Sequence, residues 1–413
     1  MYKNHLENID SKKLLFVNTF TSTLLIASIA FIFYHFIFHG YYLDSAWPKN
    51  SFFQKPEIIG NDFSRMVDVS SSLDPYSNMR RVFLNEANPY SLLSYIYFYL
   101  LSLLNLFTPM QLLYTLHCVI FILVFLLINL KYFRIKEFGF TPVFIATFLS
   151  FPFLYLLDRG NIESLLFILT YFGLYFYYHK NNLYLSSVFL ILATAFKPYY
   201  GIFFTLYIFD KKYKEFFYSL IAGILLLLFC SIVLNGDLKS HISGFMDEVK
   251  LISGICFSYK YNCNNLSLKI PFSFNSSFFF NVFCVFLFAS TMIFHYFFKF
   301  KRWQMLLMLC LLTYFIPIMS YTYKLITLFI PIYYLIDDIK YESVKSIKSY
   351  GIIFGLLLSC IYISLGFQHL FLKSILILTY FLLISDRFKE SELFKSKISY
   401  LKKIFTKKWK QKN

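Results

Sequence analysis

Long runs of apolar residues alternate with short polar segments along almost the whole chain. A helix needs about 20 consecutive apolar residues to cross a bilayer. Measured against that length, the pattern predicts twelve transmembrane helices. They cover residues 14–38, 91–107, 110–130, 139–157, 162–178, 183–209, 216–234, 278–298, 303–319, 325–336, 350–367 and 369–385. We therefore predict an all-α polytopic membrane protein.

The positions of the basic residues give this bundle an orientation. With a cytoplasmic N-terminus, the twelve-span topology puts 23 of the 39 Lys and Arg residues in cytoplasmic segments and 14 in outer segments. Cytoplasmic loops of membrane proteins carry the excess of Lys and Arg. We therefore expect both termini to be cytoplasmic and the protein to lie in the cell (inner) membrane.

One segment disagrees with this topology. Residues 131–138 (KYFRIKEF) are basic but fall on the outer side. Either 91–107 is a re-entrant or surface helix, or the weak charge bias at 131–138 is overruled by the neighbouring segments.

Two polar segments are long enough to carry chemistry, and both fall on the outer side. They are residues 39–90, after the first span, and residues 235–277, after the seventh. We predict a single transmembrane domain over residues 1–385, with these segments as its external loops. Residues 386–413 hold ten Lys and Arg residues, which is typical of a cytoplasmic tail that binds anionic lipid.

Composition excludes whole classes of function. The chain is 58% hydrophobic and only 15% charged, whereas soluble domains have about 25% charged residues. A soluble enzyme is therefore excluded, and so is a nucleic-acid-binding protein, because the net charge of +17 lies largely in the loops and the tail. The sequence contains no metal-binding Cys/His spacing and no phosphate-binding Gly-rich loop, so we expect no metal ion and no ATP-driven transport.

The first external loop holds a candidate general base. Asp62 and Arg65 lie on one side of any helix that covers this part of the loop. A carboxylate at the lipid surface, beside a cation, is suited to take a proton from a hydroxyl group. The alternative is an ordinary solvated loop.

Charged residues inside or beside the apolar runs are more informative, because burying them is costly and usually functional. The turn at 158–164 (DRGNIES) contains Arg159 and Asn161, and a simple interhelical turn is an equal alternative. Lys197 precedes Pro198 inside an apolar run, where a kink presents its ammonium group to a phosphate. Snorkelling toward the interface is the alternative for this lysine. A polar patch at 320–324, ending in Lys324, lies at the outer boundary.

The order and spacing of these residues resemble glycosyltransferase family 87, a polyprenol-phosphate-mannose-dependent mannosyltransferase-like group with the GT-C fold. The resemblance covers about residues 14–340. Its elements are Asp62-Phe63 with Pro75-Tyr76, Arg159-Gly160-Asn161, Lys197-Pro198, and Ser320-Tyr321-Thr322-Tyr323-Lys324-Leu325. The two long external loops also fall where GT-C enzymes have theirs.

The resemblance implies transfer of a sugar, with inversion, from a polyprenyl-phosphate carrier to a lipid-linked or glycan acceptor on the outer side. It implies no cofactor besides this lipid-linked donor. Asp62 would deprotonate the acceptor hydroxyl. The substrate-binding residues would be Lys197 and Lys324 first, at the donor phosphate, then Arg65, with Arg159, Asn161, Tyr76 and Tyr323 around them. The twelve-span topology, however, places the Arg159-Gly160-Asn161 turn on the cytoplasmic side, away from Asp62.

Two other functions remain open from the sequence. A polysaccharide polymerase or ligase of the O-antigen type is also a polytopic, aromatic-rich chain, but takes an oligosaccharide on a lipid diphosphate. A lipid-sugar flippase would have repeat-related halves, and no such internal symmetry is visible.

Overall fold

The computed structural model describes residues 2–38, 60–71, 73–76, 90–258, 277–317, 322–359 and 368–390. These residues are helical apart from turns and short connections, and no strand occurs among them. The helices are α1 (Tyr2–Phe38), α2 (Asn61–Val69), α4 (Leu92–Asn105), α5 (Met110–Phe133), α6 (Ile135–Phe138), α7 (Thr141–Phe148), α8 (Phe151–Arg159), α9 (Glu163–Tyr178), α10 (Leu183–Phe196), η2 (Pro198–Phe204), α11 (Thr205–Phe209), α12 (Tyr213–Val233), α13 (Leu238–Ser258), α14 (Ser277–Phe298), α15 (Arg302–Phe315), η3 (Thr322–Leu328), α16 (Phe329–Asp338), η4 (Ile339–Tyr341), α17 (Val344–Leu358) and α18 (Gln368–Glu390), where η marks a 3₁₀ helix.

Four helical segments among the described residues are long and apolar enough to cross a membrane: Ile9–Ala30, Met110–Phe133, Tyr213–Val233 and Phe280–Phe298. A fifth is added if α7 and α8, which are bent by 50° at a short break, form one span. Helices that satisfy their own backbone hydrogen bonds are what a bilayer requires. The all-helical architecture agrees with the predicted polytopic membrane protein, but it does not confirm twelve spans.

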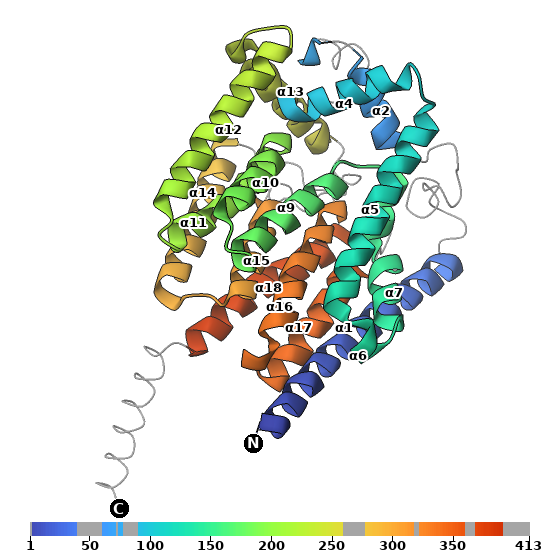
Figure 1. Ribbon diagram of the computed structural model, residues 1–413, viewed down its shortest axis with the longest axis vertical. Helices are drawn as coiled ribbons and strands as arrows, with labels where there is room; N and C mark the ends of the chain where they lie inside the picture. Colours follow the sequence, from blue (N-terminus) through green and yellow to red (C-terminus); the bar gives the residue numbers. More distant parts are fainter. Residues whose placement is uncertain are drawn as a thin grey trace, which may run out of the picture.

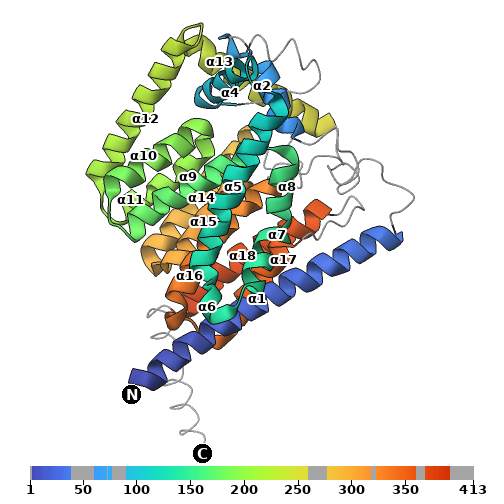
Figure 2. The same ribbon diagram turned by 45° about the vertical axis from the view of Figure 1, so that its right-hand side comes forward.

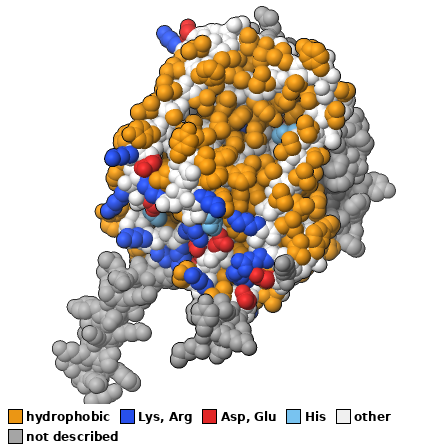
Figure 3. Space-filling model, viewed as in Figure 1, with side chains coloured by type: hydrophobic (Ala, Val, Ile, Leu, Met, Phe, Trp, Pro, Cys, Tyr) orange, Lys and Arg blue, Asp and Glu red, His pale blue; other side chains and the backbone are white. Residues whose placement is uncertain are grey.

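The helices run between two ends of the molecule, which we call the upper and lower ends as drawn in Figure 1. α2, α4 and α13 lie at the upper end, and α6 and the beginning of α1 lie at the lower end in both ribbon views (Figures 1 and 2). At the lower end, Lys12 Nζ donates a hydrogen bond of 2.8 Å to the carbonyl oxygen of Glu342. On the face shown in Figure 3, hydrophobic side chains cover the middle, and most charged side chains gather toward the lower end.

The predicted span 91–107 does not run between the two ends. Its helix, α4, lies across the upper end beside α2 (Figure 1). Tyr95 Oη donates to the carbonyl oxygen of Val69 over 3.2 Å, and the Phe63 and Phe98 rings lie 6.3 Å apart. Hydropathy identified an apolar helix here, but it does not report the helix direction. The sequence left two explanations open for the basic segment 131–138. The direction of α4 agrees with the one in which 91–107 is a surface helix.

This placement brings residues 131–138 to the lower end. α5 descends from α4 to α6 (Figures 1 and 2), so the basic residues 131–138 lie at the same end as the beginning of α1. The twelve-span topology put them at the end opposite the N-terminus, which differs from this arrangement. Counting residues 131–138 with the segments at the end where α1 begins increases the excess of Lys and Arg at that end, as the positive-inside rule expects.

The predicted span 183–209 is also different, because the chain reverses within it. α10 ends at Phe196, and η2 with α11 returns alongside it, as shown by the 3.0 Å hydrogen bond from Tyr207 Oη to Ser186 Oγ. Pro198 begins η2, and its ring and missing N–H prevent α10 from continuing. Lys197 therefore lies at the tip of a helical hairpin.

The predicted external loops and tail lie mostly outside the described residues. Within 39–90, residues 60–71 contain α2, and within 235–277, residues 238–258 form α13. α18 continues past residue 385 to Glu390, and residues 391–413 of the tail lie outside the described part.

Candidate active site

The helix that carries Asp62 is fixed to the turn at 158–161. The N–H of Gly60 donates to the carbonyl oxygen of Asp158 over 2.8 Å. Gly160 has a φ of +63°, and a Cβ added there would lie 2.7 Å from Phe63 Cβ and 2.8 Å from Tyr114 Cε2. Only glycine permits both this backbone conformation and this close approach. The Gly160 position therefore allows α2 to dock directly on the turn.

This docking brings Asp62 and Asn161 into contact. Asn161 Nδ2 donates to Asp62 Oδ2 over 3.0 Å, while Asn161 Oδ1 accepts the N–H of Glu163 over 3.1 Å at the start of α9. Asn161 is buried and Asp62 is partly exposed. The predicted separation of Asp62 from the Arg159-Gly160-Asn161 turn is therefore wrong. It followed from counting α4 as a crossing helix.

Glu163 is the centre of a second polar group next to this pair. Its carboxylate is fully buried and lies 2.8 Å from Lys197 Nζ. Tyr200 Oη donates to Glu163 Oε2 over 2.7 Å, and Tyr199 Oη donates to Glu163 Oε1. The first residue of α9 is thus joined to the hairpin tip between α10 and η2.

Lys324 completes this group from a distant part of the chain. Its side chain is 3% exposed, and its Nζ lies 3.7 Å from the centre of the Tyr199 ring, a favourable cation–π contact. The negative charge of Glu163 favours the charged form of Lys324, and the positive charge of Lys197 opposes it. One buried carboxylate therefore pairs with Lys197 and attracts Lys324 at longer range, and we call Glu163, Lys197 and Lys324 the cationic cluster.

Tyr90 lies between the Asp62–Asn161 pair and the cationic cluster. Lys197 Nζ is 5.4 Å from the centre of its ring. Burial, and then the charges of Asp62 and Glu163, raise the pKa of the Tyr90 hydroxyl well above its ordinary value, although Arg65 and a hydrogen bond with Asn161 act in the opposite direction. Tyr90 therefore stays protonated near neutral pH and available as a hydrogen-bond donor.

The other predicted residues lie around this centre. Arg65, on the next turn of α2, is partly exposed. Its positive charge partly offsets the rise in the pKa of Tyr90. The Arg159 guanidinium lies 5.7 Å from the Tyr155 ring centre and interacts with Asp62. The Tyr323 ring centre is 6.0 Å from Lys197 Nζ.

Tyr76 is placed differently from the rest. Its hydroxyl donates to the carbonyl oxygen of Tyr90 over 3.4 Å, and its ring packs against Gly244 and His241 of α13. Its contacts therefore support Tyr90, so a role in substrate binding would be indirect.

Sequence reasoning assigned no role to Glu163, Tyr90, Tyr199 or Tyr200. A signal existed for Glu163, because an acidic residue opening one apolar run and a lysine inside another are expected to pair within a membrane protein. Ser320 and Tyr321 of the late motif lie outside the described residues. In the described part of the chain, no three His, Cys, Asp or Glu residues gather where they could hold a metal ion.

Comparison with known proteins gives one match. The family model of glycosyltransferase family 87 matches residues 88–320, more than half of the chain. The match includes Asn161, Glu163 and Lys197, but it begins after Asp62 and ends before Lys324. No curated protein and no solved structure matches the chain significantly.

Proposed function

Because the chain belongs to glycosyltransferase family 87, we propose that it transfers a sugar, preferably a mannose-like hexose, from a polyprenyl-phosphate carrier. The acceptor is a lipid-linked sugar or a glycan, the reaction inverts the anomeric carbon, and it occurs at the extracytoplasmic face of the cell membrane in a GT-C-like fold. The observation that supports this most directly is the proximity of a carboxylate, Asp62, to the cationic cluster at the upper end.

The cationic cluster is suited to a lipid phosphate. Glu163 balances Lys197. Burial lowers the pKa of Lys324 to about 7, so a bound phosphate anion would favour its charged form. When the bond between sugar C1 and the phosphate oxygen breaks, negative charge grows on the leaving phosphate. Lys197 and Lys324 stabilise that charge, and the low polarity of the buried surroundings strengthens their effect. The leaving group needs no added proton, since it departs as a phosphate anion.

Asp62 is suited to activate the acceptor. Its hydrogen bond with Asn161 fixes one carboxylate oxygen and thereby the orientation of the group. The carboxylate takes the proton of the acceptor hydroxyl while that oxygen forms a bond with C1. Attack from the side opposite the phosphate gives inversion. Tyr90, a neutral donor between the two groups, is placed to bind a sugar hydroxyl or a phosphate oxygen.

The proposal is tested with purified protein in nanodiscs containing a lipid extract from the host. One sample receives radiolabelled mannose on polyprenyl monophosphate, and a parallel sample receives an oligosaccharide on a polyprenyl diphosphate. We expect transfer from the monophosphate donor alone. Turnover of the diphosphate-linked oligosaccharide alone would contradict the proposal and indicate a polymerase or ligase.

A further inference from the structure

The beginning of α4 contacts both halves of the proposed site. α4 lies across the upper end (Figure 1) and packs on α2, which carries Asp62, and on α10, which ends just before Lys197. Ser91, Ser94 and Tyr95 at its beginning are buried. Each of these three side chains donates a hydrogen bond to another element.

The two serines bind the end of α10. Ser91 Oγ and Ser94 Oγ each lie 2.7 Å from the carbonyl oxygen of Phe196, and Ser91 Oγ also reaches the carbonyl oxygen of the preceding residue. The last carbonyl groups of a helix have no N–H partner within that helix, and Pro198 has no N–H to offer. The serines therefore supply donors that this bend of the chain lacks, directly before Lys197.

Tyr95 binds the helix of the proposed base. Its hydroxyl donates to the carbonyl oxygen of Val69, the last residue of α2, over 3.2 Å. One turn further along α4, the Phe98 ring packs on the Phe63 ring at 6.3 Å, and Phe63 follows Asp62 directly. The same short part of α4 thus holds α2 by its last turn and by its first.

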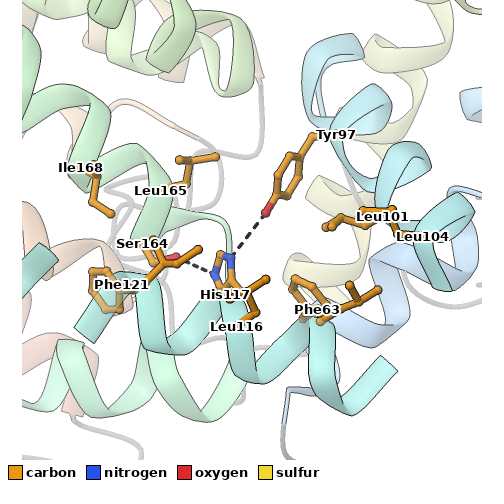
Figure 4. A pocket seen from close by; sticks show the side chains of 12 residues that line it. Phe63, Tyr97, Leu101, Leu104, Leu116, His117, Phe121, Ser164, Leu165 and Ile168 are labelled. Carbon is orange, nitrogen blue, oxygen red and sulfur yellow. Dashed lines mark hydrogen bonds between the residues drawn. The ribbon is translucent and has the colours of Figure 1, made fainter. Parts of the chain in front are cut away.

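Tyr97 links α4 to the partner of Asp62. Figure 4 shows dashed contacts from His117 to Tyr97 on one side and to Ser164 on the other. Tyr97 Oη lies 3.5 Å from His117 Nδ1, and Ser164 Oγ lies 2.9 Å from His117 Nε2. Ser164 Oγ donates in turn to the carbonyl oxygen of Asn161 over 2.9 Å. Polar contacts therefore lead from α4 to the turn on which α2 docks.

We propose that the beginning of α4 fixes the separation of Asp62 from Lys197. Ser91 and Ser94 are positioning residues for Lys197, and Tyr95 is a positioning residue for the helix of Asp62. The proposal rests on the proposed function, which takes Asp62 as the base and Lys197 as a ligand of the donor phosphate. Inversion requires the acceptor oxygen and the phosphate on opposite sides of C1, and a misplacement of about 1 Å can lower a rate about 10²-fold.

The serine side is tested by combining Ser91→Ala with Ser94→Ala. Without both hydroxyls the end of α10 is released beside Lys197. We expect the Kd for farnesyl phosphate and the KM for the lipid-phosphate donor to rise about tenfold, with an unchanged acceptor KM. Each single variant keeps one serine on the Phe196 carbonyl and should show a smaller rise. Equilibrium binding and initial rates are measured on the full protein in nanodiscs.

The tyrosine side is tested by Tyr95→Phe, which removes only the hydroxyl. We expect kcat to fall about tenfold or more, because α2 with Asp62 is held less firmly. The Kd for farnesyl phosphate and the donor KM should stay unchanged, because the serines still hold the end of α10. General destabilisation would change kcat and donor binding together in both sets of variants.

Two matched controls remove the same groups elsewhere. The Thr194 hydroxyl donates within α10 to the carbonyl oxygen of Leu190 over 2.8 Å, so Thr194→Val loses a bond that does not involve α4. Tyr184, near the other end of α10, is 77% exposed, so Tyr184→Phe removes a hydroxyl far from the site. We expect both variants to bind and transfer like the unchanged protein.

Two outcomes would overturn the proposal while leaving the proposed function intact. One is that the serine and tyrosine variants match the controls, and the other is that both sets change kcat and donor binding alike. If the unchanged protein neither binds farnesyl phosphate nor transfers from the lipid-phosphate donor, the proposed function is contradicted, and the role given to α4 fails with it.

Discussion

At Glu163, one fully buried carboxylate accepts hydrogen bonds from Lys197, Tyr199 and Tyr200. An uncompensated charge in such a place is strongly unfavourable, and removing one partner of a buried ion pair commonly costs about 3–5 kcal/mol. Glu163 is therefore a positioning residue: it holds Lys197 in place and offsets the repulsion between Lys197 and Lys324.

We predict that Glu163→Gln lowers the free energy of unfolding by about 3–5 kcal/mol, because the shape is kept while the countercharge is lost. Adding Lys197→Met to this variant should restore much of the loss. Thermal unfolding of the detergent-purified protein measures both effects. Glu137→Gln is the control, since it removes an exposed ion pair with Arg134 of 2.6 Å, worth at most about 1 kcal/mol. Unchanged stability of Glu163→Gln would contradict the role given to Glu163.

Lys324 gives a prediction about the donor. Burial lowers the pKa of Lys324 to about 7, and a bound phosphate would favour its charged form. Replacing it with methionine therefore removes an ammonium group that the donor phosphate would attract. We predict that Lys324→Met raises the KM for polyprenyl-phosphate-mannose about tenfold or more, while Lys345→Met, at an exposed position, does not. Initial rates at varied donor concentration decide this. A rise in the acceptor KM with an unchanged donor KM would place the donor phosphate elsewhere.

The contact between α2 and the turn at 158–161 positions Asp62. Hydrogen bonds from the Gly60 N–H and from Asn161 hold α2 there, and Gly160 leaves no room for a Cβ. Because Asp62 reaches the site only through this docking, a small change in the turn should affect transfer strongly.

We predict that Gly160→Ala abolishes most transfer, because its Cβ would displace Phe63 and the positive φ would be strained. Gly139→Ala is the control. Gly139 also has a positive φ, of +75°, but has nothing within 4 Å of an added Cβ. Transfer assays on both membrane-inserted variants make the comparison. Equal activity in the two variants would show that close docking of α2 on the turn is not required.

The sequence predicted the helical class and several residues that the structure brings together. Asp62, Asn161, Lys197 and Lys324 were found from charges in apolar surroundings and from motif order. Hydropathy failed for α4 and for the α10–η2 hairpin, because it measures how apolar a segment is and not the direction in which it runs. The gathering of Lys197 and Lys324 around Glu163 depends on the packing of segments far apart in sequence, which no local pattern reports.

For the whole molecule, the path of the chain sets which groups share a side of the membrane. The site containing Asp62 lies at the upper end, and residues 131–138 lie at the lower end with the beginning of α1 (Figures 1 and 2). The hydropathy-based topology instead placed residues 131–138 and the loop of Asp62 on the same side.

We predict that Glu137→Cys and Asp68→Cys react with a membrane-impermeant maleimide from opposite sides of the membrane. Asp68 on α2 and Glu137 on α6 are both exposed. Intact spheroplasts should label only position 68, and inverted vesicles only position 137. The unsubstituted chain controls for its seven native cysteines. Labelling of both positions from one side would contradict the path described for α4 and α5.

Comparing Asp62→Asn with Asp68→Asn in the nanodisc transfer assay tests the role of Asp62 as the base. Both aspartates lie on α2, but only Asp62 contacts Asn161. We predict that Asp62→Asn lowers the transfer rate by about 10²–10⁴-fold, the usual contribution of a general base, with little change in the donor KM, and that Asp68→Asn transfers like the unchanged protein. Full transfer by Asp62→Asn would contradict the assignment of the base and with it the site proposed around Asp62.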